Sequence, residues 1–286
     1  MRYGITMFAT DVSIDIVELA REAEARGLQS LWLPEHTHIP VSRRTPPPTG
    51  DAELAPEYFR CLDPLVALGA AANATTTLRL GTGILLAAQR EPIVTAKAVA
   101  TLDYLSGGRA ALGVGFGWNE DELANHGVTM PDRRDVAREH ILAMQALWAD
   151  DEASFSGDHV QLQPSWSWPK PVQRGGDGRP RVPVLHGGAA GPKLFAHIAE
   201  YGNGWIPIGG GGLTDAIPRL RDAMAEAGRD PANLEVVPFG SLPDAGKLDH
   251  FERLGVTECV FRIPSAPRDV VLPILDEQAA LVASRT

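Results

Sequence analysis

A chain of 286 residues in which 44% are hydrophobic and 22% are charged has an ordinary globular composition, which argues against a disordered or membrane-embedded class. The longest apolar runs, such as Leu65–Ala72, are far too short to span a bilayer. The formal charge of −10 disfavours a nucleic-acid partner, because phosphate contacts need a basic surface. We therefore expect a small-molecule ligand, with no nucleic-acid and no membrane partner.

The N-terminus and the cysteines indicate the compartment. Met1, Arg2 and Tyr3 lead straight into an alternating strand pattern, without the apolar core of a secretory signal, so we expect a cytoplasmic protein. Cys61 and Cys259 are the only cysteines and lie far apart in the sequence. Neither a disulfide framework nor a cysteine-based zinc site is predicted.

Eight short apolar runs alternate with helical patterns along nearly the whole chain, and such alternation predicts a parallel sheet. Eight is the strand number of the TIM barrel, so we predict a single (β/α)₈ TIM-barrel domain over residues 1–286. The expected strands are Arg2–Phe8, Ser30–Leu33, Leu78–Leu86, Arg109–Phe116, Val182–His186, Gly204–Ile208, Leu234–Phe239 and Thr257–Ile263.

Proline and glycine delimit four helices between these strands. Pro92 and Pro192 stand at the starts of helical runs, and Gly27 and Gly228 directly follow the ends of two others. The expected helices are Ile14–Arg26, Ile93–Leu105, Leu194–Tyr201 and Ile217–Ala227.

Two segments interrupt the alternation. The first, His36–Arg60 after the second strand, contains Pro46-Pro47-Pro48 and Gly50, and we interpret it as a mobile lid without secondary structure. The second, Asp150–Pro180, lies between the fourth and fifth strands and contains a small hairpin predicted over Phe155–Val160. In barrels, insertions at the C-terminal ends of strands are where function usually resides.

The second strand ends in a cluster of titratable residues. Glu35, His36 and His38 follow it directly. Histidine titrates near neutral pH, so this cluster can transfer protons. The alternative is that these side chains only hydrogen-bond to the backbone of the loop.

Glycines mark the ends of the third, fourth and fifth strands. Gly81 and Gly83 in one strand and Gly113 and Gly115 in the next predict either a flat floor for a planar ring or close packing inside the barrel. The fifth strand ends in Gly187-Gly188, shortly before a helix, where backbone N–H groups can bind an anion such as phosphate. A simple tight turn is the alternative.

Taken together, these motifs resemble the luciferase-like monooxygenases, and most of all the actinobacterial branch of coenzyme F420-dependent oxidoreductases. The resemblance covers almost the whole chain in order. The segments that carry it are Trp32–His36, Gly81–Leu85, Leu102–Arg109, Gly113–Glu120, Pro169–Gln173, Gly187-Gly188 and Tyr201–Trp205.

The resemblance implies a role for individual residues. It implies a cis peptide bond between Gly83 and Ile84 that supports the deazaflavin ring, and a proton-handling role for His36. Phe116, Gly117 and Trp118 then form the neighbouring wall of the ring site. His186, Gly187 and Gly188 form the turn that binds the phosphate, and Glu35 is the remaining candidate for proton transfer. The family also implies a homodimer.

Two positions depart from the family pattern. Trp118 stands where one branch has a second acid, so a donor and acceptor pair is not expected, and His186 stands where a branched aliphatic residue is usual. The family's sugar-phosphate oxidation is therefore not carried over. We expect hydride transfer between coenzyme F420 and an organic substrate, with FMN as the alternative cofactor.

Two other classes compete with this interpretation. His36-x-His38 resembles the metal-binding motif of barrel amidohydrolases, but the fourth strand carries no lysine and the eighth ends without an aspartate, so we expect no metal. A binding barrel that has lost its cofactor is the other class, and the retained glycines argue against it.

Overall fold

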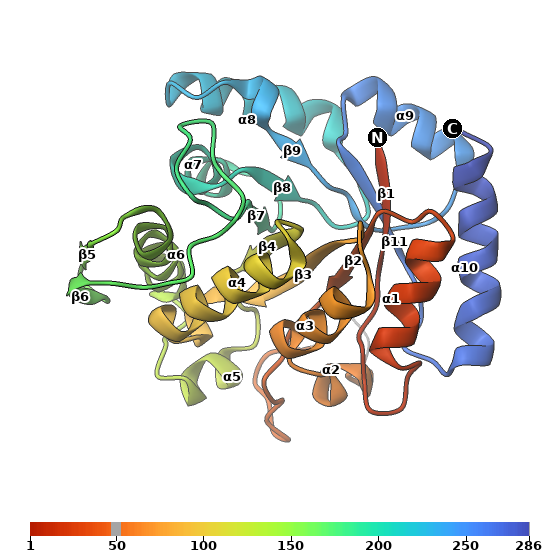
Figure 1. The fold of residues 1–286 in the computed structure, drawn as a ribbon, viewed down its shortest axis with the longest axis horizontal. Coiled ribbons are helices and arrows are strands. Elements are labelled where there is room, and N and C mark those ends of the chain that lie inside the picture. The colour runs from red at the N-terminus through yellow and green to blue at the C-terminus, as the bar shows by residue number, and fades with distance from the viewer. Residues whose placement is uncertain (47–52, 286) are drawn as a thin grey trace.

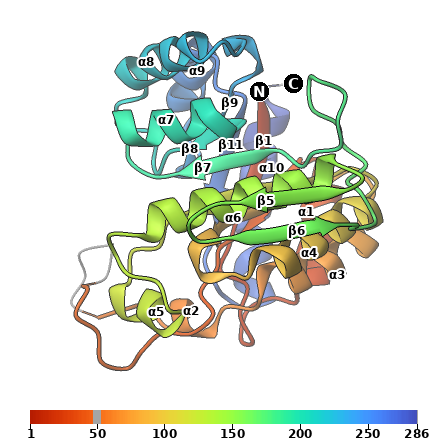
Figure 2. The ribbon, with the colours of Figure 1, turned by 90° about the vertical axis from the view of Figure 1, so that its left-hand side faces the viewer.

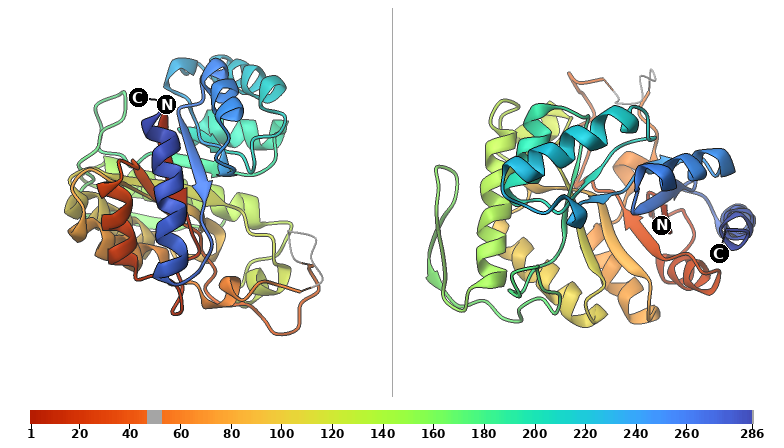
Figure 3. Two further views of the ribbon diagram at one scale, coloured as in Figure 1. Left: turned by 90° about the vertical axis from the view of Figure 1, so that its right-hand side faces the viewer. Right: turned by 90° about the horizontal axis from the view of Figure 1, so that it is seen from above.

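The computed structural model describes residues 1–46 and 53–285 and has an α/β fold built on a curled, nine-stranded parallel sheet (Figures 1 and 3). The order across the sheet is β10-β11-β1-β2-β3-β4-β7-β8-β9. The strands are β1 (Arg2–Thr6), β2 (Ser30–Leu33), β3 (Arg79–Leu86), β4 (Ala110–Gly115), β7 (Val184–Gly187), β8 (Gly204–Ile206), β9 (Glu235–Val236), β10 (Phe239–Ser241) and β11 (Glu258–Arg262).

The seventh expected strand is divided, which corrects the prediction of one strand over Leu234–Phe239. Its two pieces, β9 and β10, pair with β8 and β11 respectively. Pro238 separates them because it has no N–H to donate to a ladder. The segment still bonds in both directions, since Val237 N donates to the Trp205 carbonyl at 2.9 Å and Val260 N donates to the Pro238 carbonyl at 3.0 Å.

Helices cover the outside of the sheet (Figure 1). The four expected helices are present as α1, α4, α7 and α8, and their bounds are shifted by up to four residues. In full, the helices are α1 (Ile16–Ala25), α2 (Glu57–Arg60), α3 (Pro64–Ala74), α4 (Pro92–Ser106), α5 (Glu120–Asn125), α6 (Arg133–Ala149), α7 (Pro192–Tyr201), α8 (Leu213–Glu226), α9 (Ala245–Leu254) and α10 (Arg268–Ala283). None of the helices in the described part of the chain combines the length and apolarity needed to cross a bilayer.

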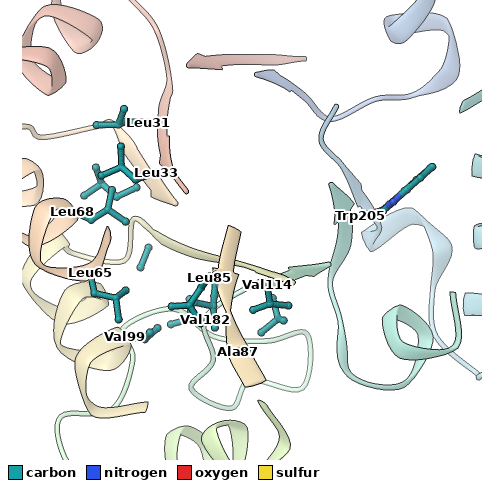
Figure 4. Packing of buried hydrophobic residues seen from close by; sticks show 14 of the residues in the cluster. Leu31, Leu33, Leu65, Leu68, Leu85, Ala87, Val99, Val114, Val182 and Trp205 are labelled. Carbon is teal, nitrogen blue, oxygen red and sulfur yellow. The ribbon is translucent and has the colours of Figure 1, made fainter. Parts of the chain in front are cut away.

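The main core lies between the sheet and these helices (Figure 4). Leu31 and Leu33 of β2 pack with Leu65 and Leu68 of α3, and all four side chains are buried. Burying one leucine contributes about 1.5–3 kcal/mol, so this layer fixes the strands whose ends carry the site.

The first long segment contains more structure than expected. Pro47, Pro48 and Gly50 lie outside the described residues. Within the described part, α2 corrects the prediction that no element forms there. Residues 37–46 are attached to α5, because the Arg44 guanidinium bonds to Asp121 at 2.9 Å.

The second long segment contains the expected hairpin, with shifted bounds. Strands β5 (Ala153–Ser156) and β6 (Gln161–Ser165) pair antiparallel beside α6 (Figure 2). The Glu139 side chain of α6 accepts three backbone N–H groups of the turn, which attaches the hairpin to the helix.

An ionic network built around the buried Glu258 occupies the N-terminal end of the sheet. The Glu258 carboxylate, on β11, accepts hydrogen bonds from Trp32 Nε1 at 2.7 Å, Arg79 Nη1 at 2.8 Å and Arg2 Nε at 3.1 Å. Glu235 binds the same two arginines. Each charge in this network has an opposite charge within hydrogen-bonding distance.

Candidate functional site

A cavity of about 580 Å³ lies at the C-terminal ends of the strands. It is the place at which the segments after β2, β3, β4 and β7 meet. All but one of the site residues expected from the sequence line it, namely Glu35, His36, Gly83, Ile84, Phe116, Gly117, Trp118, Gly187 and Gly188.

His186 is the exception. Its neighbour Leu185 belongs to the cluster inside the sheet, and side chains alternate along a strand, so His186 points toward the helices. Its ring stacks with Phe116 at 6.1 Å and meets Tyr201 edge-on at 4.8 Å. The residue therefore packs behind the cavity wall, where it positions the Phe116 ring.

The His186 ring is neutral at physiological pH. Burial lowers its pKa to about 3, and the nearby His197 and Arg134 act in the same direction. Neither ring nitrogen has a hydrogen-bond partner among the residues that the structure describes. Such a buried, unsatisfied group costs stability and needs an explanation.

His36 is held by an acid that the sequence did not reveal. Its Nδ1 lies 2.8 Å from one carboxylate oxygen of Glu122 and 3.1 Å from the other. Both side chains are almost fully buried. Asn119 caps α5 by accepting the N–H of Asp121 at 3.2 Å, and this places Glu122 in the first turn of the helix, facing His36.

Glu35 lines the cavity, but its carboxylate is already engaged. It accepts the N–H of Leu86 at 2.7 Å and Arg90 Nε at 2.6 Å. Only 2% of the residue is exposed. This arrangement ties the end of β2 to the end of β3, so Glu35 positions the neighbouring His36.

The second histidine of the H-x-H motif lies apart from the cavity. His38 is bonded to Thr37 and Asn125, and its ring faces His126 at 5.6 Å. No cluster of three or more His, Cys, Asp or Glu side chains suited to a metal ion is found in residues 1–46 and 53–285.

The strand glycines are explained mainly by close packing, one of the two alternatives that the sequence left open. A Cβ on Gly81 would overlap Trp32, and one on Gly83 would overlap Phe239. A Cβ on Gly115 would overlap the side chain of Ile84. The Gly83–Ile84 peptide bond is cis, as the resemblance implied.

Two arginines missed by the sequence reasoning make another side of the cavity positive. Arg133 and Arg134, in the first turn of α6, both line it. The Arg134 guanidinium lies 4.3 Å from the centre of the Phe116 ring. Neither arginine forms an ion pair with a described residue, and burial together with Arg134 lowers the pKa of Arg133.

The Gly187-Gly188 turn borders the same cavity as these arginines. Gly188 has a φ of +141°, which side chains with a Cβ rarely adopt. An anionic group would meet positive charge and exposed backbone here, so this side of the cavity fits a phosphate. The Arg133-Arg134 pair in the sequence is the signal that could have identified it.

The fold is thus an α/β fold with a cavity at the C-terminal ends of a parallel sheet, lined on one side by a histidine that a buried glutamate holds and on another by two arginines without acidic partners among the described residues. Residues 9–242 match the model of the luciferase-like monooxygenases. The chain belongs to this family, whose members are oxidoreductases or monooxygenases.

Three similar proteins illustrate the range of the family. An uncharacterised protein of Mycobacterium tuberculosis is 43% identical over 99% of both chains. An F420-dependent glucose-6-phosphate dehydrogenase of Amycolatopsis mediterranei is 32% identical over 74% of this chain and 58% of the relative. The crystal structure of a monooxygenase from Streptomyces bottropensis has the same fold, with a TM-score of 0.80 and 20% identity, over 100% of this chain and 99% of that one.

Proposed function

We propose that the protein is a coenzyme F420-dependent oxidoreductase that transfers a hydride between the deazaflavin ring and a small organic substrate. The observation that carries the proposal is the cavity itself, which is lined both by His36, held from behind by the buried Glu122, and by Arg133 and Arg134, which have no acidic partner among the described residues. Relatives named as F420-dependent enzymes, at 29% and 32% identity, support the choice of cofactor. We also infer that the sheet closes as a (β/α)₈ barrel, because residues 235–241 bond to both β8 and β11.

The residues present fit such a cofactor. Ile84 and Phe116 offer apolar surface for a planar ring, while Arg134 and the Gly187-Gly188 turn suit its phosphate. When bound, coenzyme F420 supplies two-electron hydride chemistry, and the protein supplies position and proton transfer.

His36 would hold the proton that accompanies hydride transfer. Glu122 occupies Nδ1, so exchange with a substrate oxygen would use Nε2. The carboxylate fixes the orientation of the ring, as a buried acid does for a catalytic histidine. Trp118, 5.8 Å from His36 ring to ring, helps to exclude water from the pair.

FMN is the competing cofactor, because it also carries a planar ring and a phosphate. Fluorescence titration with each compound tests the proposal. We expect micromolar or tighter binding of coenzyme F420 and binding of FMN at least about tenfold weaker, a difference of about 1.4 kcal/mol. Equal or tighter binding of FMN would overturn the F420 assignment, and binding of neither would overturn the proposed function.

A further inference from the structure

Four aromatic rings surround the part of the cavity next to His36. Phe8 and Tyr58 lie 4.8 Å apart, Tyr58 and His36 5.4 Å, and Tyr58 and Trp118 6.3 Å, centre to centre. All four residues line the cavity. Aromatic rings at these separations form a surface on which another ring or an apolar chain packs well.

The charged groups on this side are already paired. Arg262, at the end of β11, lines the cavity, but Glu57 of α2 accepts its Nη2–H at 2.9 Å. Glu35 is paired with Arg90 and His36 with Glu122. Cations without an acidic partner line the cavity only at Arg133 and Arg134, as far as the described residues show.

We propose that the substrate is a neutral, ring-bearing alcohol or ketone that binds among Phe8, Tyr58 and Trp118, and that Glu57 determines this preference by neutralising Arg262. The proposal rests on the proposed function, because the anionic side must be occupied by the cofactor. A substrate with a carboxylate or phosphate would then meet an Arg262 that Glu57 already neutralises and find no free cation beside His36.

Two compounds of similar shape, 2-naphthylmethanol and 2-naphthoate, test the preference for a neutral substrate. Saturation-transfer NMR measures the binding of each to the F420-saturated protein. Wild-type protein should bind the alcohol at least about fivefold more tightly. Glu57→Gln should reduce that preference by about fivefold, the upper range for an exposed ion pair, because it frees Arg262. Glu200→Gln, which removes a carboxylate from the exposed pair with Arg138, is the control.

Tighter binding of the carboxylate by wild-type protein, or an unchanged preference in Glu57→Gln, would overturn the inference while coenzyme F420 still binds. Failure of coenzyme F420 to bind overturns the proposed function and this inference with it. The two failures are therefore distinguishable.

Discussion

A cavity lies at each end of the curled sheet, but the charged side chains that line the two cavities differ in whether they have partners of opposite charge. At the N-terminal end, a cavity of about 520 Å³ is lined by Arg2, Arg79 and Glu235, whose charges compensate one another. At the C-terminal end, the cavity of about 580 Å³ has Arg133 and Arg134 without acidic partners among the described residues. The charges of the network at the first end compensate one another, whereas the second end keeps two cations that the proposed function assigns to an anionic group of the cofactor.

This difference shows how one fold separates stability from function. Burial raises the pKa of Glu235, but Arg79 and Arg2 outweigh it, so its pKa lies below the usual value and its carboxylate stays charged. Unpaired cations at the other end lower the stability of the folded state slightly, and they would increase its affinity for an anionic ligand. Substitutions at the two ends should therefore affect different quantities.

The largest effect is expected at His36. His36→Ala should slow turnover by about 10²- to 10⁴-fold, the usual contribution of a positioned acid or base, and leave cofactor affinity nearly unchanged. Single-turnover oxidation of reduced coenzyme F420 by an accepted substrate measures the rate, and titration measures the affinity. A loss of less than about fivefold would reduce His36 to a positioning residue.

The next largest effect is expected at the balanced end. Glu258→Ala leaves Arg2 and Arg79 with one carboxylate fewer and Trp32 Nε1 without its acceptor at 2.7 Å. It should lower the free energy of unfolding by about 3–5 kcal/mol, as removal of one partner of a buried pair does. Urea unfolding measures this, with the exposed Glu252→Ala as control. Equal effects of the two substitutions would show that burial of the network is unimportant.

A third effect depends on pH. The pKa of His186 is about 3 in the folded protein, so below pH 6.5 the unfolded chain binds a proton that the folded protein does not. Stability should therefore fall as the pH drops from about 6.5 to 3, and by about 2 kcal/mol at pH 5. His186→Leu should remove that loss.

Unfolding in urea at pH 7.5 and pH 5 compares His186→Leu with wild-type protein. The exposed His250→Leu is the matched control. If wild-type protein and His186→Leu lose the same stability between the two pH values, the ring is solvated or paired in the folded protein.

The smallest effect is expected at the phosphate side. Gly188→Ala places a Cβ on a backbone with a φ of +141° and should weaken binding of coenzyme F420 by about tenfold, about 1.4 kcal/mol. Gly211→Ala is the control, since a Cβ there would meet open space. Unchanged affinity in a folded Gly188→Ala protein would mean that the turn only reverses the chain.

The strands were predictable from the sequence because their apolar runs are short and their boundaries are marked by glycine and proline. All eight expected runs contain a strand, and only Pro238 divides one of them. Once the strands were assigned, the location of the residues that follow them was also predictable, because parallel strands bring their C-terminal ends together. His36 and Gly188 were therefore placed in one cavity without any knowledge of distances.

The partners of these residues could not be predicted. Glu122 lies 86 positions from His36, and the spacing Asn119-x-x-Glu122 is that of a helix-capping box, which gives such a glutamate a local role. In the structure its carboxylate contacts His36 instead. Strand alternation would have directed His186 away from the cavity, but the resemblance grouped it with the glycines that follow it.

A crystal structure of the protein with coenzyme F420 tests the account most directly, because the two ends of the sheet offer cavities of similar size. The account predicts the deazaflavin ring against Ile84 and Phe116 and the phosphate beside Gly188 and Arg134. A cofactor bound in the N-terminal cavity, beside Gln29 and Arg109, would contradict it.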